Sequence, residues 1–372
     1  MQKLLILILL AILSIYSSNC FASIKAVQIS YLNVKNLIEL EKEFVKIKKN
    51  GFNTIIFRVF HNKGDRFYPF IKRKNDCGVY FKTRYLPCVN NCLGKICSLA
   101  HQHNLKLIAW MQTRYLDCKN FSANRKVFKF DFKGNKFKVS RGLSFFNKKN
   151  FNFILKVYLD LLKYPIDGIL LQDDLKILID EDFNPEAIKI FYKKTKIKLS
   201  ENNVKKILYG STNSRKHVKP TKYFFIWQNI KSAQIKKFLD FLTFNLKTKK
   251  KIKIFMNVSY EFLINSHLSK KWYGYDYETL KNTLIDKFVV MMYQEQIKKE
   301  LKISDKQYYK LASAIIKTGN KLNKKRFIFK IQSYNWYIDK RIKKRVIENL
   351  LTFLKINNIK NFAIFPYYKN MF

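Results

Sequence analysis

The chain has 372 residues, of which 48% are hydrophobic and 16% aromatic, so a large core is available and a disordered chain is excluded. Its formal net charge is +47, from 73 Lys and Arg against 26 Asp and Glu. The lysines are spread along the whole sequence, and Gly (10) and Pro (6) are few, a bias typical of an AT-rich genome. We therefore interpret the charge as a solvated basic surface and do not expect nucleic acid as a partner. Binding to nucleic acid or an anionic envelope polymer is the alternative.

Residues 1–22 have the pattern of a signal peptide. Lys3 precedes the apolar run Leu4–Ile15, and Cys20-Phe21-Ala22 follows as a small-residue cleavage site. The run is too short for a stable membrane-spanning helix, and no later stretch is apolar for long enough. We predict an exported chain, 23–372, that is periplasmic, outer-membrane associated or extracellular. An uncleaved anchor and a lipid-modified Cys20 are the alternatives.

Short β-branched or aromatic runs alternate with longer stretches of helical period in the rest of the chain. The expected strands are Ala26–Tyr31, Asn53–Val59, Lys106–Trp110, Gly168–Gln172, Lys253–Val258, Lys287–Met292, Phe327–Gln332 and Asn361–Pro366. The expected helices are Leu37–Asn50, Leu93–His103, Asn150–Lys163, Tyr223–Lys247, Tyr277–Ile285, Lys306–Lys317 and Lys340–Ile356. Eight strands that alternate with helices along the chain predict a single α/β domain, a (β/α)₈ barrel. A doubly wound open sheet is the structural alternative, but no Gly-rich phosphate loop follows the first strand.

Two strand-to-helix connections, Phe60–Asn91 and Leu116–Phe146, are long, and Lys196–Lys222 is a polar insertion. Long loops after barrel strands belong to the face where active sites form. The five cysteines after residue 22 all lie between residues 77 and 118: Cys77, Cys88, Cys92, Cys97 and Cys118. In an exported protein they predict at least one disulfide. A zinc site is the alternative, although tight C-x₂-C spacing is missing.

The most informative local signal is Asp173-Asp174, which follows the apolar strand Gly168–Gln172. Adjacent carboxylates after a buried strand are expected at the rim of the barrel, where catalytic groups lie. We expect Asp174 to lie further out on this rim. The segment 160–186, which also contains Asp180 and Asp182, holds eight acidic and two basic residues. Clustered carboxylates suit the acid and base of glycoside hydrolysis. The alternative is structural: a helix cap at Asp174 and an ion pair at Asp173.

Aromatic residues follow three other expected strands. Trp110 ends the third, Tyr293 follows the sixth, and Tyr334 and Trp336 follow the seventh. Aromatic faces stack on sugar rings, and neighbouring amides bind hydroxyl groups. We predict that Asp180, Asp182 and these aromatic residues contact substrate. No histidine pair or serine elbow indicates a metal or serine hydrolase, so we expect no metal and no other cofactor.

Taken together, these residues resemble the C-terminal, glycoside-hydrolase-like barrel domain of the poly-β-1,6-N-acetyl-D-glucosamine N-deacetylases of biofilm polysaccharide export. The similar segments are Val27-Gln28-Ile29-Ser30-Tyr31-Leu32, Lys82-Thr83-Arg84-Tyr85-Leu86-Pro87, Ile108-Ala109-Trp110-Met111, Asp167–Asp174, Gln332-Ser333-Tyr334-Asn335-Trp336 and Phe365-Pro366-Tyr367.

The resemblance implies an exported glycoside hydrolase that cleaves partially deacetylated poly-N-acetylglucosamine. It implies a substrate groove containing Asp173 and Asp174, with Trp110, Tyr334 and Trp336 stacking on sugars. It also implies that the protein associates with the envelope or the export machinery. Gln172 stands where the better-known members are expected to have His. No segment matches the metal-dependent deacetylase domain, so we expect no deacetylase activity. A noncatalytic polysaccharide-binding or export-guiding barrel is the functional alternative.

Overall fold

The computed structural model describes residues 23–372, so the predicted signal peptide lies outside the described residues. Eight parallel strands form a closed barrel in the order β1-β14-β11-β10-β9-β8-β5-β2. These strands are β1 (Lys25–Ile29), β2 (Thr54–Arg58), β5 (Lys106–Met111), β8 (Gly168–Leu171), β9 (Lys253–Ser259), β10 (Lys287–Met291), β11 (Phe327–Gln332) and β14 (Phe362–Phe365). Each overlaps one of the eight expected strands, and the predicted (β/α)₈ fold is confirmed.

The strands read as continuous apolar runs because both of their faces are buried. Alternate residues point into the barrel, where each strand contributes to one buried apolar cluster that includes Ala26, Ile56, Ile108, Leu170, Phe255, Val289, Ile328 and Ala363. The residues between them pack outward against the helices in the main core. The inside of the barrel is therefore filled by side chains, and a ligand can be held only at its ends.

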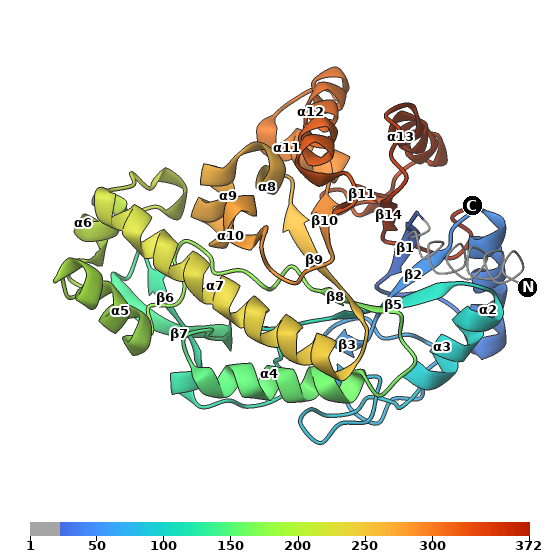
Figure 1. Cartoon of the computed structure of the whole chain (residues 1–372), viewed down its shortest axis with the longest axis horizontal. Helices are drawn as coiled ribbons and strands as arrows, with labels where there is room; N and C mark the ends of the chain where they lie inside the picture. The colour runs from blue at the N-terminus through green and yellow to red at the C-terminus, as the bar shows by residue number, and fades with distance from the viewer. Residues whose placement is uncertain (1–22) are drawn as a thin grey trace, which may run out of the picture.

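The helices lie outside the barrel, as Figure 1 shows. They are α2 (Leu37–Lys49), α3 (Leu93–Gln102), α4 (Lys148–Leu161), α5 (Pro185–Thr195), α6 (Val204–Tyr209), α7 (Lys222–Lys249), α8 (Glu261–Ile264), α9 (Ser266–Tyr273), α10 (Tyr277–Leu280), α11 (Gln294–Leu301), α12 (Asp305–Asn323) and α13 (Lys344–Ile356). Expected helices match α2, α3, α4, α7, α12 and α13. Among residues 23–372, no helix is long and apolar enough to cross a membrane.

Two predicted helices are shorter than expected. The helix predicted from Lys340 begins only at Lys344, because Lys340–Arg341 form β13. We predicted Tyr277–Ile285, but α10 ends at Leu280. The hydroxyl group of Thr283 donates a hydrogen bond to the carbonyl oxygen of Leu280 at 2.7 Å. Threonine side chains that bind the backbone in this way compete with helical hydrogen bonds, which explains the early end.

The long connections carry structure that the sequence did not indicate. The loop after β5 contains the antiparallel hairpin of β6 (Lys126–Asp131) and β7 (Lys136–Leu143), and the loop after β2 pairs β3 (Phe60–His61) with β4 (Gly78–Val79). After β11, β12 (Tyr334–Asn335) pairs with β13 (Lys340–Arg341). In Figure 1 the β6–β7 hairpin lies beside α5 and α6, at the opposite end of the molecule from α2.

A disulfide joins Cys77, directly before β4, to Cys118 in the loop between β5 and β6. It confirms the prediction of at least one disulfide and links the two long loops. Cys88, Cys92 and Cys97 are free thiols. Burial raises the pKa of Cys92 and of Cys97 to about 12, so both stay protonated and unreactive at neutral pH.

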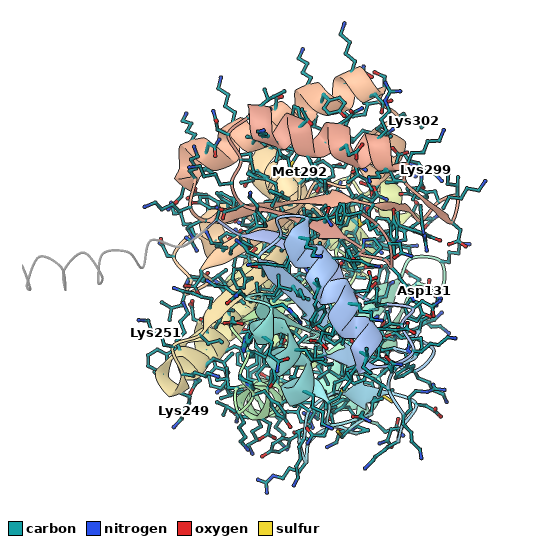
Figure 2. The ribbon with its side chains drawn as sticks, turned by 90° about the vertical axis from the view of Figure 1, so that its right-hand side faces the viewer. Asp131, Lys249, Lys251, Met292, Lys299 and Lys302 are labelled. Carbon is teal, nitrogen blue, oxygen red and sulfur yellow. A yellow bond between two sulfur atoms is a disulfide. The ribbon has the colours of Figure 1, made fainter. Side chains whose placement is uncertain are left out.

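Basic side chains project from well-separated parts of the surface. Figure 2 shows Lys249 and Lys251 on one side of the molecule and Lys299 and Lys302 on the other. All four are exposed. This distribution fits a generally basic surface and does not single out one patch.

Candidate active site

The site lies at the carboxyl end of the barrel, next to the apolar cluster. The residues two positions further along each strand also point inward, because side chains alternate along a strand. Most of them are polar or aromatic, and seven line one cavity of about 260 Å³: Gln28, Trp110, Gln172, Asn257, Met291, Lys330 and Phe365. Asp173, Tyr293, Gln296 and Trp336 complete its lining. This volume is just below the ~300–1,000 Å³ of pockets for drug-sized ligands and suits a small unit such as one sugar.

Asp173 is the one carboxylate among the described residues that lines this cavity. It lies two residues after the end of β8, and its side chain is 39% exposed. The ammonium group of Lys176 lies 3.8 Å from its Oδ2 atom, an ion pair weakened by solvent. A partly solvated carboxylate at the mouth of a cavity can accept or donate a proton or bind a sugar hydroxyl group.

Asp174 has a different environment, and our expectation that it lies further out on the rim is wrong: it is only 4% exposed. Its carboxylate accepts hydrogen bonds from the backbone N–H groups of Thr113, Arg114 and Tyr115 and from the Thr113 hydroxyl group, at 2.7–3.1 Å. Burial raises the pKa of Asp174, although these donors favour the charged form. Asp174 thus holds the turn that follows β5, and it does not line the cavity.

The structure does not bring Asp180 and Asp182 into the cavity either, although both were expected to contact substrate. Both are buried, at 2% and 0% exposure. Asp180 pairs with Lys129 and Arg215, and Asp182 pairs with the buried Arg114 at 3.4 Å. The carboxylates of the acidic segment therefore point to different partners in the folded chain. Asp180 holds β6 through Lys129, and Asp182 holds the turn after β5 through Arg114.

Three of the four predicted aromatic residues do meet at the cavity. Trp110, Tyr293 and Trp336 line it together with Phe365. The ring centroids of Tyr293 and Trp336 are 5.2 Å apart, and the Trp110 ring meets Phe365 edge-on at 5.5 Å. Trp336 remains 40% exposed, so its face is available for stacking. Tyr334 does not line the cavity: its hydroxyl group donates a hydrogen bond to Asp339 at 2.6 Å.

The cavity also contains three residues that were not predicted from the sequence: Gln28, Asn257 and Lys330. The buried amine of Lys330, on β11, donates hydrogen bonds to Gln28 Oε1 at 2.9 Å and Asn257 Oδ1 at 2.5 Å. Burial lowers the pKa of Lys330 to about 7, although the negative charge of Asp173 opposes the shift. The period of two along a strand could have found them, because each stands two positions after an apolar residue that points into the barrel.

A larger hollow, of about 650 Å³, opens at the opposite end of the barrel. Its lining includes Lys253, Lys287 and Phe327, which begin β9, β10 and β11. Active sites of (β/α)₈ barrels form at the carboxyl ends of the strands, whereas the amino ends contribute to stability. We therefore assign the candidate site to the smaller cavity. No cluster of three His, Cys, Asp or Glu side chains suited to a metal ion occurs in residues 23–372.

The closed barrel and the carboxylate-bearing, aromatic-walled cavity at its carboxyl end define a barrel of the glycosyl hydrolase type. The chain belongs to hypothetical glycosyl hydrolase family 13, whose model matches residues 40–368. No curated protein matches the chain.

Two solved structures show the same fold. The PgaB (BpsB) glycoside hydrolase domain from Bordetella bronchiseptica has 17% sequence identity and a TM-score of 0.69, covering 92% of this chain and 94% of that domain. The catalytic domain of β-amylase from Paenibacillus polymyxa has 11% identity and a TM-score of 0.55, with 92% of each chain covered. The first confirms the resemblance at the level of the fold.

Proposed function

We propose that this chain is a glycoside hydrolase in which Asp173 is the essential acid or base. Its substrate would be a glucosamine-containing polysaccharide, with partially deacetylated poly-β-1,6-N-acetylglucosamine as the first candidate. The observation that carries the proposal is the position of Asp173 in a sugar-sized cavity beside Trp110, Tyr293 and Trp336. Family membership and the fold shared with the PgaB glycoside hydrolase domain support it.

We also propose that the protein is exported to the periplasm, the outer membrane or the medium. The signal-like segment 1–22 and the Cys77–Cys118 disulfide support export, because disulfides persist in oxidising compartments. Association with the envelope or the export machinery stays a prediction.

The test incubates the protein with partially deacetylated poly-β-1,6-N-acetylglucosamine and uses mass spectrometry to detect shorter oligosaccharides. Loss of a required acid or base lowers the rate by about 10²–10⁴. We therefore expect Asp173→Asn, which keeps the size of the side chain but cannot ionise, to lose activity to this extent with an unchanged melting temperature. Cleavage by Asp173→Asn at the wild-type rate would show that the assigned role is wrong.

A noncatalytic sugar-binding barrel is the second candidate. One observation favours it: a single carboxylate lines the cavity among the described residues, whereas most glycoside hydrolases use two. In that case the wild-type chain binds the polymer and releases no shorter products. Equilibrium binding measured beside the cleavage assay separates the two functions.

A further inference from the structure

The floor of the cavity is organised around one buried amine. Lys330 is 1% exposed and lies between Gln28 on β1 and Asn257 on β9. A lysine ammonium group has three donors and no acceptor. Its hydrogen bonds to Gln28 Oε1 and Asn257 Oδ1 therefore fix both amides with their oxygen atoms toward Lys330. The NH₂ groups of both side chains are left to donate to a bound molecule.

The other polar groups of the cavity lie outside this floor. Gln172 lines the same cavity with a buried amide oxygen that has no donor, and Asp173 at the mouth supplies a carboxylate. The ammonium group of Lys330 lies 5.5 Å from the ring centroid of Phe365 and 5.9 Å from that of Tyr293. The deepest part of the cavity thus combines hydrogen-bond donors and a buried cationic group with apolar aromatic walls.

We propose that the cavity floor formed by Gln28, Asn257 and Lys330 is a subsite for an acyl or carboxyl oxygen of the substrate, and that it disfavours a free sugar amine. The shared chemistry is an sp² oxygen acceptor, which an N-acetylated sugar supplies as an amide carbonyl and an acidic sugar as a carboxylate. The inference rests on the proposed function, because it describes the sugar that this same site receives.

The physical reason is charge and hydrogen-bond matching. The amine of glucosamine is protonated in the same range as Lys330, so placing it on this floor puts two like charges together in a region of low polarity. It would also leave the amide donors without an acceptor, which is costly when the groups are buried. An acetamido group satisfies these donors, and its methyl group can pack on the ring of Phe365.

Binding of three oligosaccharides to the purified full chain tests the proposal. The probes are a β-1,6-linked N-acetylglucosamine pentasaccharide, its fully deacetylated counterpart and a glucuronate-containing pentasaccharide. Calorimetry at pH 6 keeps Lys330 protonated, because burial lowers its pKa only to about 7. We expect the deacetylated probe to bind at least tenfold more weakly than the better of the other two. The stronger of those two identifies the acceptor as an acyl carbonyl or a carboxylate.

Two variants assign the preference to the floor. Lys330→Met removes the charge and keeps an apolar chain of similar length, and we expect it to reduce the preference to less than threefold. Asn257→Asp places a carboxylate against the amine, and we expect it to improve binding of the deacetylated probe relative to the acetylated one. Lys302→Met, an exposed lysine outside the cavity, is the matched control and should keep the wild-type preference.

Several outcomes overturn the inference: equal or tighter binding of the deacetylated probe by the wild-type chain, no binding of any probe, or an unchanged preference in both floor variants. The proposed function is tested apart from it, by cleavage with the wild type and Asp173→Asn. A chain that cleaves but shows no preference refutes the subsite alone. A chain that shows the preference but never cleaves refutes the hydrolase alone.

Discussion

Asp173 and Asp174 are neighbours in the chain but differ in every contact that decides their chemistry. Asp173 lines the cavity beside Lys176, and Asp174 is enclosed by the turn after β5. The turn Thr113–Tyr115 follows the strand that carries Trp110. We therefore interpret Asp174 as a positioning residue that acts through this turn, and Asp173 as the candidate for catalysis.

Replacing Asp174 by Asn should destabilise the protein. The Asp174 carboxylate accepts hydrogen bonds from three backbone N–H groups and one hydroxyl group, and an amide can offer them only one oxygen. A buried donor left without a partner costs about 1–3 kcal/mol. Thermal denaturation measures the effect, and Asp173→Asn is the matched control because its side chain is half-exposed. Identical melting temperatures for the two variants would contradict this role.

At the scale of elements, the two long loops are joined to each other at the carboxyl end of the barrel. The Cys77–Cys118 disulfide connects the segment before β4 with the segment between β5 and β6. The loop after β5 is further held by Arg114, which pairs with Glu181 at 3.3 Å and with Asp182. These two loops are thereby fixed by a covalent link to each other and by a buried ionic network to the segment after β8.

Removing this disulfide should lower stability. Cross-links of this kind contribute about 2–4 kcal/mol, mainly by restricting the unfolded chain. We expect the double variant Cys77→Ser/Cys118→Ser to lose about this much in denaturant unfolding. Cys88→Ser, which removes a free thiol from the same region, is the control. Intact-mass analysis with and without reductant checks the bond itself, and a mass without any disulfide would refute it.

At the scale of the whole molecule, burial of two lysines makes folding sensitive to pH. Burial lowers the pKa of Lys330 and of Lys231 to about 7, although nearby carboxylates oppose the shift. Lysine in the unfolded chain titrates near 10.4. Between about pH 7 and 10 the unfolded chain therefore binds more protons than the folded one, and stability rises with pH.

The expected result is a melting temperature that increases from pH 7 to pH 9. The prediction ends at pH 9 because burial raises the pKa of thiols and tyrosines such as Cys92 and Tyr158. At higher pH these groups ionise more readily in the unfolded chain, which lowers stability. Lys330→Met should flatten this dependence, since methionine does not titrate. If the melting temperature of the variant rose with pH as steeply as that of the wild type, burial would not lower the pKa of Lys330.

The sequence by itself determined the barrel, because strand and helix signals are local. Each apolar run, such as Phe288-Val289-Val290, is long enough to indicate a strand covered on both faces. The same reasoning placed Asp173 and Trp110 at the carboxyl end, where strand order alone predicts a site. The cysteine-rich segment likewise predicted a disulfide without indicating which residues form it.

Only the tertiary structure decided the composition of the site. The floor of the cavity takes Gln28 from β1, Asn257 from β9 and Lys330 from β11, residues brought together by barrel closure across more than 300 positions of sequence. It also separated Asp173 from Asp174, Asp180 and Asp182, which are close in the chain but are turned toward different partners. Closeness in sequence does not set the direction of a side chain after a strand ends. That direction depends on which backbone donors and cations fold against it, and these contacts are nonlocal.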